Sequence, residues 1–123
     1  MPTQMRHSGG LVDVVLELGY DQVKYFEGTI AGTATGFTIT PPARRITVMN
    51  QDGANAVYLR INPPAGETAE ASVGFTPGDN IKIGAGCNFS MDFDSLSEIS
   101  LVTDGASVDI EGILGWKGIH PDC

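Results

Sequence analysis

The sequence has little of the side-chain chemistry from which catalytic and metal sites are built. Its histidines are His7 and His120, near opposite ends of the chain, and its cysteines are Cys87 and Cys123, without metal-ligand spacing. It contains no Gly-x-Ser-x-Gly nucleophile elbow and no phosphate-binding loop. We therefore expect a protein that is not an enzyme, with no catalytic residue, no cofactor and no metal.

Basic residues are also few. The chain has 7 Lys and Arg against 15 Asp and Glu, a formal net charge of −8, and its one adjacent basic pair is Arg44-Arg45. Because nucleic-acid binding depends largely on Lys and Arg neutralising phosphates, we expect no nucleic-acid partner. An anionic membrane surface is disfavoured for the same reason.

Long hydrophobic runs are missing as well. The apolar stretch Leu11–Leu18 is interrupted by Asp13 and Glu17, and no stretch approaches the roughly 18 apolar residues of a membrane helix. Nothing resembles a signal-peptide core, so we expect no membrane association and a reducing compartment with free thiols. A disulfide between Cys87 and Cys123 stays an alternative.

Glycine and proline are abundant, with 16 and 7 residues, and they divide the chain into short segments. No window shows a clean helical period, and turn signals recur about every ten residues, which is typical of a β-sandwich or barrel. We predict an all-β fold, a single jelly-roll-like or related antiparallel sandwich over residues 11–117. A flexible arm, 1–10, precedes it and a tail, 118–123, follows.

Alternation of apolar and polar residues locates the strands. The predicted strands are Leu11–Leu18, Phe37–Thr40 ending at Pro41-Pro42, 73–75, 80–83, 87–94 and 113–117. Residues 23–36 are ambiguous, because Val23, Tyr25 and Ile30 favour a strand while three glycines favour an irregular course. Asp52-Gly53 and Asp104-Gly105 predict tight turns in two hairpins, over residues 45–62 and 98–111.

Two carboxylate pairs, Asp92/Asp94 and Asp109/Glu111, invite comparison with a glycosidase. Each pair sits at i and i+2 of a predicted strand, about 7 Å apart. Both lie opposite the apolar face, where solvated carboxylates are normal, so we interpret them as surface charges. The oxygen donors from Asp92 to Glu98 suggest calcium only weakly, since they lack the glycine and spacing of an EF-hand loop.

Candidate interface residues are the aromatic and basic side chains placed away from the predicted core. Tyr58 and Arg60 lie opposite Val57 and Leu59 on one strand. Trp116 is either a core cap or an interface anchor, and Trp and Arg are enriched at binding hot spots. The predicted interface set is Tyr58, Arg60, Trp116, Arg44 and Arg45.

Residues 45–62, Arg-Ile-Thr-Val-Met-Asn-Gln-Asp-Gly-Ala-Asn-Ala-Val-Tyr-Leu-Arg-Ile-Asn, resemble a pattern of small tailed-bacteriophage virion proteins. The likeness continues through Pro77-Gly78-Asp79 to Phe93, then 99–103 and 108–112, and covers roughly residues 37–117. It is a pattern of strands and turns without a diagnostic functional motif.

The resemblance implies a capsid decoration (cement) protein, made in the host cytoplasm, that binds the major capsid protein on the capsid exterior. It also implies a homo-oligomer, a trimer being favoured. An acidic chain suits the exterior, because packaged DNA would repel it, and both ends could order on a neighbouring subunit. A tail or head–tail component and a carbohydrate-binding β-sandwich remain alternatives.

Overall fold

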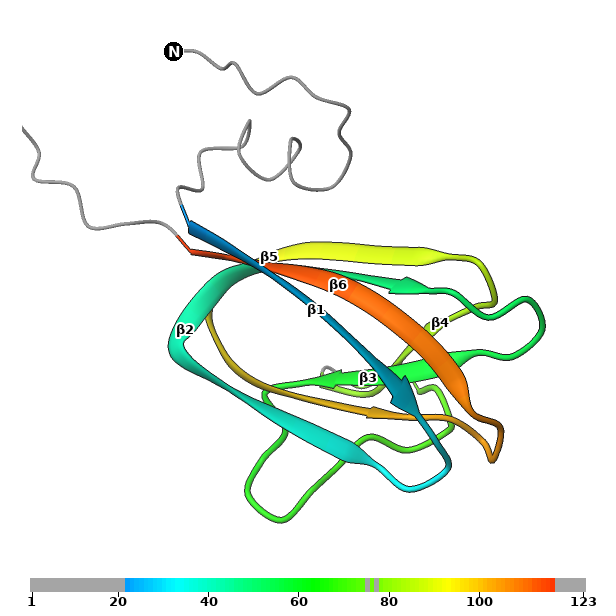
Figure 1. Ribbon diagram of the computed structural model, residues 1–123. Coiled ribbons are helices and arrows are strands. Elements are labelled where there is room, and N and C mark those ends of the chain that lie inside the picture. The colour runs from blue at the N-terminus through cyan, green and yellow to red at the C-terminus, as the bar shows by residue number, and fades with distance from the viewer. Residues whose placement is uncertain (1–21, 75, 77, 117–123) are drawn as a thin grey trace, which may run out of the picture.

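The protein is all-β in the computed structural model (Figure 1), which describes residues 22–74, 76 and 78–116. The predicted strand Leu11–Leu18, the arm 1–10 and the tail 118–123 lie outside the described residues. The strands are β1 (Gln22–Ile30), β2 (Thr35–Asn50), β3 (Val57–Ile61), β4 (Ile81–Ile83), β5 (Asn88–Val102) and β6 (Val108–Trp116). No helix occurs among the described residues. The predicted fold class is confirmed.

The strands form one antiparallel sheet, in the order β1-β6-β2-β5-β3-β4, that folds over into two layers. The long strands β2 and β5 belong to both layers. Residues 35–38 of β2 pair with 98–101 of β5, whereas 45–49 pair with 88–92, and register shifts separate the two ladders. A strand pair that bends together in this way turns a single sheet into a sandwich.

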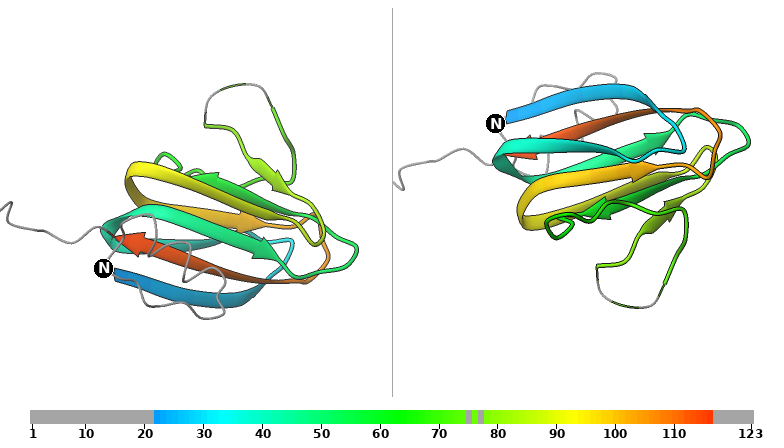
Figure 2. Two further views of the ribbon diagram at one scale, coloured as in Figure 1. Left: turned by 90° about the horizontal axis from the view of Figure 1, so that it is seen from above. Right: turned by 90° about the horizontal axis from the view of Figure 1, so that it is seen from below.

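Layer one contains β1, β6, the second half of β2 and the first half of β5. Layer two contains the first half of β2, the second half of β5, β3 and β4. Figure 2 shows layer one in its left panel, with β5, β2, β6 and β1 side by side, and layer two in its right panel. Among the strands that the structure describes, each layer ends at two edges without a further neighbour in the sheet.

The bend of β2 lies at Pro41-Pro42, where the sequence predicts that a strand ends. The strand instead continues to Asn50. Its ladder with β5 breaks between Thr38 and Ala43, as expected for prolines that cannot donate a hydrogen bond, and the Thr40-Pro41 peptide is cis. The prolines thus end one ladder and redirect the chain from layer two to layer one.

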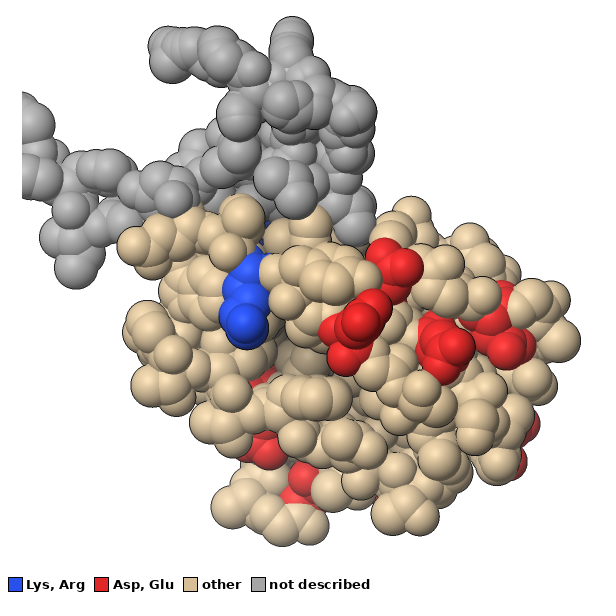
Figure 3. All heavy atoms as spheres, in the orientation of Figure 1, with Lys and Arg blue, Asp and Glu red and all other residues tan. Residues whose placement is uncertain are grey.

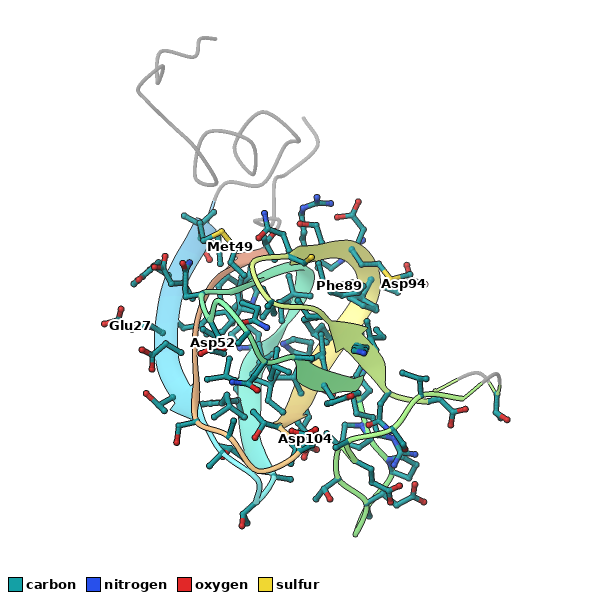
Figure 4. All side chains as sticks on the ribbon, turned by 90° about the vertical axis from the view of Figure 1, so that its right-hand side faces the viewer. Glu27, Met49, Asp52, Phe89, Asp94 and Asp104 are labelled. Atoms are coloured by element: carbon teal, nitrogen blue, oxygen red, sulfur yellow. The ribbon has the colours of Figure 1, made fainter. Side chains whose placement is uncertain are left out.

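Both predicted hairpins are wrong. The strands that flank Asp52-Gly53, β2 and β3, are separated in the sheet by β5, and those that flank Asp104-Gly105, β5 and β6, are separated by β2. Each loop is an arch that carries the chain from one layer to the facing layer. Figure 4 labels one aspartate in each arch, Asp52 and Asp104.

The ambiguous stretch 23–36 holds β1 and the start of β2, joined by a turn at 31–34. The predicted strands at 80–83, 87–94 and 113–117 correspond to β4, the start of β5 and the end of β6. The predicted strand at 73–75 is absent from its described residues, 73 and 74, and Val73 is exposed.

The core lies between the layers and is filled by aliphatic side chains from both. Its fully buried members include Ile46, Val48 and Ile110 from layer one, and Leu59 and Leu101 from layer two. In a strand the side chains alternate between the faces, so the intervening residues point to the outer face of their layer. The candidate residues lie on these outer faces and at the open sides between the layers.

Candidate functional site

The five predicted interface residues fall in two separate places. Tyr58 and Arg60 alternate with the buried Val57 and Leu59, and so lie on the outer face of layer two. Arg44, Arg45 and Trp116 lie at the end of layer one where β2 meets β6, since Arg45 is aligned with Gly115. The structure therefore brings together two subsets of the predicted set.

Arg60 holds a loop of its own chain. Its Nη2 donates to Glu67 Oε1 at 2.6 Å, its Nη1 to the Thr68 carbonyl at 3.3 Å and its Nε to the Gly78 carbonyl at 3.2 Å. These bonds hold Glu67, Thr68 and Gly78, in the loop between β3 and β4, over the outer face of layer two. Tyr58, half-buried on the same face, is aligned with Lys82 and Val102.

Trp116 closes one side of the sandwich. Its indole N–H donates to the Pro41 carbonyl at 2.7 Å, across the bend of β2, and its ring packs against the core. Beside it is a groove of about 270 Å³ lined by Lys24, Phe26, Phe37, Thr38, Ile39, Thr40, Ile99, Leu114 and Trp116. Of the two roles expected for Trp116, the geometry favours the core cap.

The arginine pair ties β2 to β5. Arg44 Nε donates to the Phe93 carbonyl at 3.2 Å, and Arg45 Nη1 donates to Asp92 Oδ1 at 2.9 Å. The side chain of Asp92 is 61% exposed, so this ion pair adds little stability. Asp92 of the first carboxylate pair is thus engaged with an arginine.

The second carboxylate pair belongs to an acidic patch on layer one, which we define as Glu27, Asp109 and Glu111. Thr29 Oγ1 donates to Asp109 Oδ1 at 2.7 Å, and Glu27 lies opposite Glu111 in the β1–β6 ladder. Acidic side chains recur across the face seen in Figure 3, and Glu27 projects away from β1 in Figure 4. These positions agree with surface charges.

Tyr25 is coupled to the acidic patch. Its hydroxyl donates to Glu27 Oε1 at 3.0 Å. This hydrogen bond, then partial desolvation and the charge of Glu111, raise the pKa of Tyr25 to about 12. A hydroxyl that holds its proton so firmly is a hydrogen-bond donor and not a base.

The carboxylate of Asp52 shapes the first arch. Asp52 Oδ2 accepts from the backbone N–H groups of Ala54 and Asn55, at 2.9 and 2.6 Å, and these donors lower the pKa of Asp52. Among residues 22–74, 76 and 78–116, no three His, Cys, Asp or Glu side chains gather as a metal would require. That part of the chain also offers no helix able to span a membrane.

The sequence missed the apolar side chains that stand exposed at the open sides of the sandwich. Met91 is 48% exposed, and Phe37 is 36% exposed at the mouth of the groove beside Trp116. Met91 borders a second hollow, on the opposite open side, which Ile61, Ile81 and Phe93 also line. Alternation alone could not find Met91, because it assigns a residue to a face without showing that its strand is at an edge.

No family model and no curated protein matches the chain. Two solved structures share part of its backbone arrangement. One, titled "Crystal structure of PirA", has a TM-score of 0.44 and 13% identity, over 74% of this chain and 92% of that one. The other, titled "Bacillus endospore appendages form a novel family of disulfide-linked pili", has a TM-score of 0.42 and 10% identity, over 78% and 87%. Likenesses this distant bear on neither family nor function.

Proposed function

We propose that the protein is a structural virion protein, a decoration or cement subunit that binds the outer surface of a phage capsid through protein–protein contacts. The observation that carries the proposal is the placement of Phe37 and Met91, one at each open side of the sandwich. Exposed apolar side chains beside hollows mark contact surfaces. Because the two surfaces differ, copies would associate head to tail, which closes into a ring when the rotation allows.

The charge distribution supports the exterior location. The patch of Glu27, Asp109 and Glu111 is held at the surface, while Arg45 and Arg60 each have a carboxylate partner in the same chain. Paired arginines are poorly placed to bind phosphates, and surface carboxylates are repelled by them. A subunit on the outside of the shell avoids this repulsion.

The experiment is co-sedimentation with emptied capsids assembled from the major capsid protein encoded nearest to the gene of this chain. We expect the wild type to pellet with capsids and Met91→Asp to remain in the supernatant. Asn88→Asp is the control, since it adds the same charge at an exposed position of the same strand. Wild-type protein that stays in the supernatant at saturating capsid concentration would contradict the proposal. Binding to isolated tails instead would support the alternative of a tail or head–tail component.

A carbohydrate-binding module is the second candidate, because the groove places Trp116 beside Phe26 and Phe37. Aromatic side chains at the rim of a groove suit the apolar faces of sugars. Glycan addition should then change the emission of Trp116, the one tryptophan of the chain. Unchanged emission across a glycan panel would count against this candidate.

A further inference from the structure

Two residues at the centre of the outer face of layer one, Ile113 and Thr47, are buried. Ile113 lies between Tyr25 and Thr47 in the β1–β6–β2 register, and it alternates with the core residue Leu114. Its side chain therefore points away from the core. Ile113 is nevertheless 2% exposed, and the adjacent Thr47 is 3% exposed. Burial this deep on an outer face calls for a segment that covers it.

Layer two shows what such a cover looks like. Ser100 lies on its outer face and is 1% exposed because the loop around Ala69 passes over it, with the Ala69 N–H donating to Ser100 Oγ at 2.9 Å. The loop that Arg60 bonds to thus covers this face. Layer one has an equally buried centre. The long side chains beside it do not explain that burial, because their polar ends bond to other residues. Tyr25 bonds to Glu27, and Arg45 reaches Asp92.

Arg45 supplies a second sign of a cover. Its Nε is shielded from solvent and has no hydrogen-bond partner. Arg45 lies on the same outer face as Ile113. It is aligned with Gly115, two residues along β6 from Ile113 toward the start of β1. Buried polar groups are almost always hydrogen-bonded, so this N–H calls for an acceptor from whatever lies above it.

We propose that residues 11–18 of the same chain dock on this outer face of layer one. Alternate side chains, Val12, Val14, Leu16 and Leu18, cover Ile113 and Thr47. Asp13 and Glu17 then point away from the face with Val15, and the backbone carbonyls of the segment offer an acceptor to Arg45 Nε. The proposal concerns the subunit itself and does not rest on the proposed function.

The tether favours this occupant. β1 begins at Gln22, so residues 19–21 alone separate the segment from the face that β1 helps to form. A short tether gives the segment a high effective concentration at the face, which an untethered partner must match by affinity. The docking is therefore assigned to the chain's own segment and not to a second copy.

The composition of the remaining chain also favours this occupant. Six of the eight residues in Leu11–Leu18 are apolar, whereas residues 1–10 are mostly polar or glycine and Ile119 is the one aliphatic residue in 117–123. Covering an apolar floor requires several apolar side chains on one side of the covering segment. Leu11–Leu18 has them in alternation, with its carboxylates between them.

The experiment is methyl NMR on the full chain with labelled Ile, Leu and Val. We expect cross-relaxation between the Ile113 methyl groups and methyls of residues 11–18, and low attenuation of Ile113 by a soluble paramagnetic agent. The proposal would be overturned if Ile113 contacted only its sheet neighbours. It would also be overturned if a mixture of labelled and unlabelled chains showed the contact to be between molecules.

A matched pair of variants tests the orientation. Leu16→Asp places a charge on the side assigned to Ile113, and should raise the paramagnetic attenuation of the Ile113 methyls at least several-fold. Val15→Asp places the same charge on the opposite side and should leave the attenuation near the wild-type value. Equal attenuation in the two variants would contradict the proposal. The Trp116 emission spectrum, expected to match the wild type in both, separates undocking from unfolding of the sandwich.

Discussion

Asn50 Nδ2 donates to the Ile83 carbonyl at 3.0 Å and thereby joins the two layers of the sandwich. The same amide donates to the Asn55 carbonyl at 2.8 Å, and Asn50 Oδ1 accepts from the Asp52 N–H at 2.8 Å. One buried side chain thus ends β2, shapes the first arch and holds β4 in the facing layer. The arch is defined by these bonds and not by strand pairing across the turn.

Replacing Asn50 by alanine should be costly for this reason. It removes three hydrogen bonds and leaves the Ile83 carbonyl without this donor inside the protein, so we expect a loss of about 2–4 kcal/mol in the free energy of unfolding. Urea unfolding measures it. Asn88→Ala, at an exposed position of β5, is the control and should change stability by less than about 0.5 kcal/mol. Similar stabilities for the two variants would contradict the role of Asn50.

Trp116→Phe separates the core cap from the interface anchor. The variant keeps most of the aromatic packing and loses the N–H bond to Pro41, so we expect about 1 kcal/mol less stability. Its mass in solution should equal that of the wild type, as light scattering can show. An interface anchor would give the reverse, with unchanged stability and weaker assembly.

Arg60→Lys should loosen the loop over layer two without changing the net charge. Lysine cannot reproduce the planar fork that reaches Glu67, Thr68 and Gly78 together. We expect faster cleavage by a Glu-specific protease at Glu67 and Glu70, several-fold relative to the wild type. Arg44→Lys, which disturbs one bond to Phe93, is the control. Equal cleavage rates would show that Arg60 does not hold the loop.

The raised pKa of Tyr25 predicts that the protein loses stability at alkaline pH. Its pKa is about 12 in the folded protein against 10.0 for the free side chain, so the folded state binds this proton more tightly than the unfolded state. The resulting stabilisation is fully present below pH 10 and is lost as pH rises towards 12. Tyrosinate absorbance should show one residue titrating near pH 12 that is missing from Tyr25→Phe. A Tyr25 that titrates with an ordinary pKa would contradict its bond to Glu27.

The sequence predicts the all-β class because alternation and turn residues are local properties of the chain. It does not predict how the strands pair. Asp52-Gly53 and Asp104-Gly105 do reverse the chain, but a reversal can place two strands side by side in one sheet or face to face in two layers. The decisive features are the buried Asn50 amide and the register shift at Pro41-Pro42, and both depend on partners distant in sequence.

The candidate site was harder to predict than the fold. Residue type selects Arg60 and Trp116 as interface residues, and that stays a prediction. Their contacts within the chain, to the loop carbonyls and the Pro41 carbonyl, form only after the layers have assembled. The exposure of Met91 follows from its place on an edge strand, which alternation does not report.

The mass of the protein in solution tests the central claim, assembly through the two open sides of the sandwich, most directly. Sedimentation velocity on the wild type should give one discrete species at a whole multiple of the 12.9 kDa chain, with a trimer favoured. Met91→Asp should shift it towards the single chain, and Asn88→Asp should not. A wild type that sediments as a 12.9 kDa monomer at every concentration tested would contradict the account.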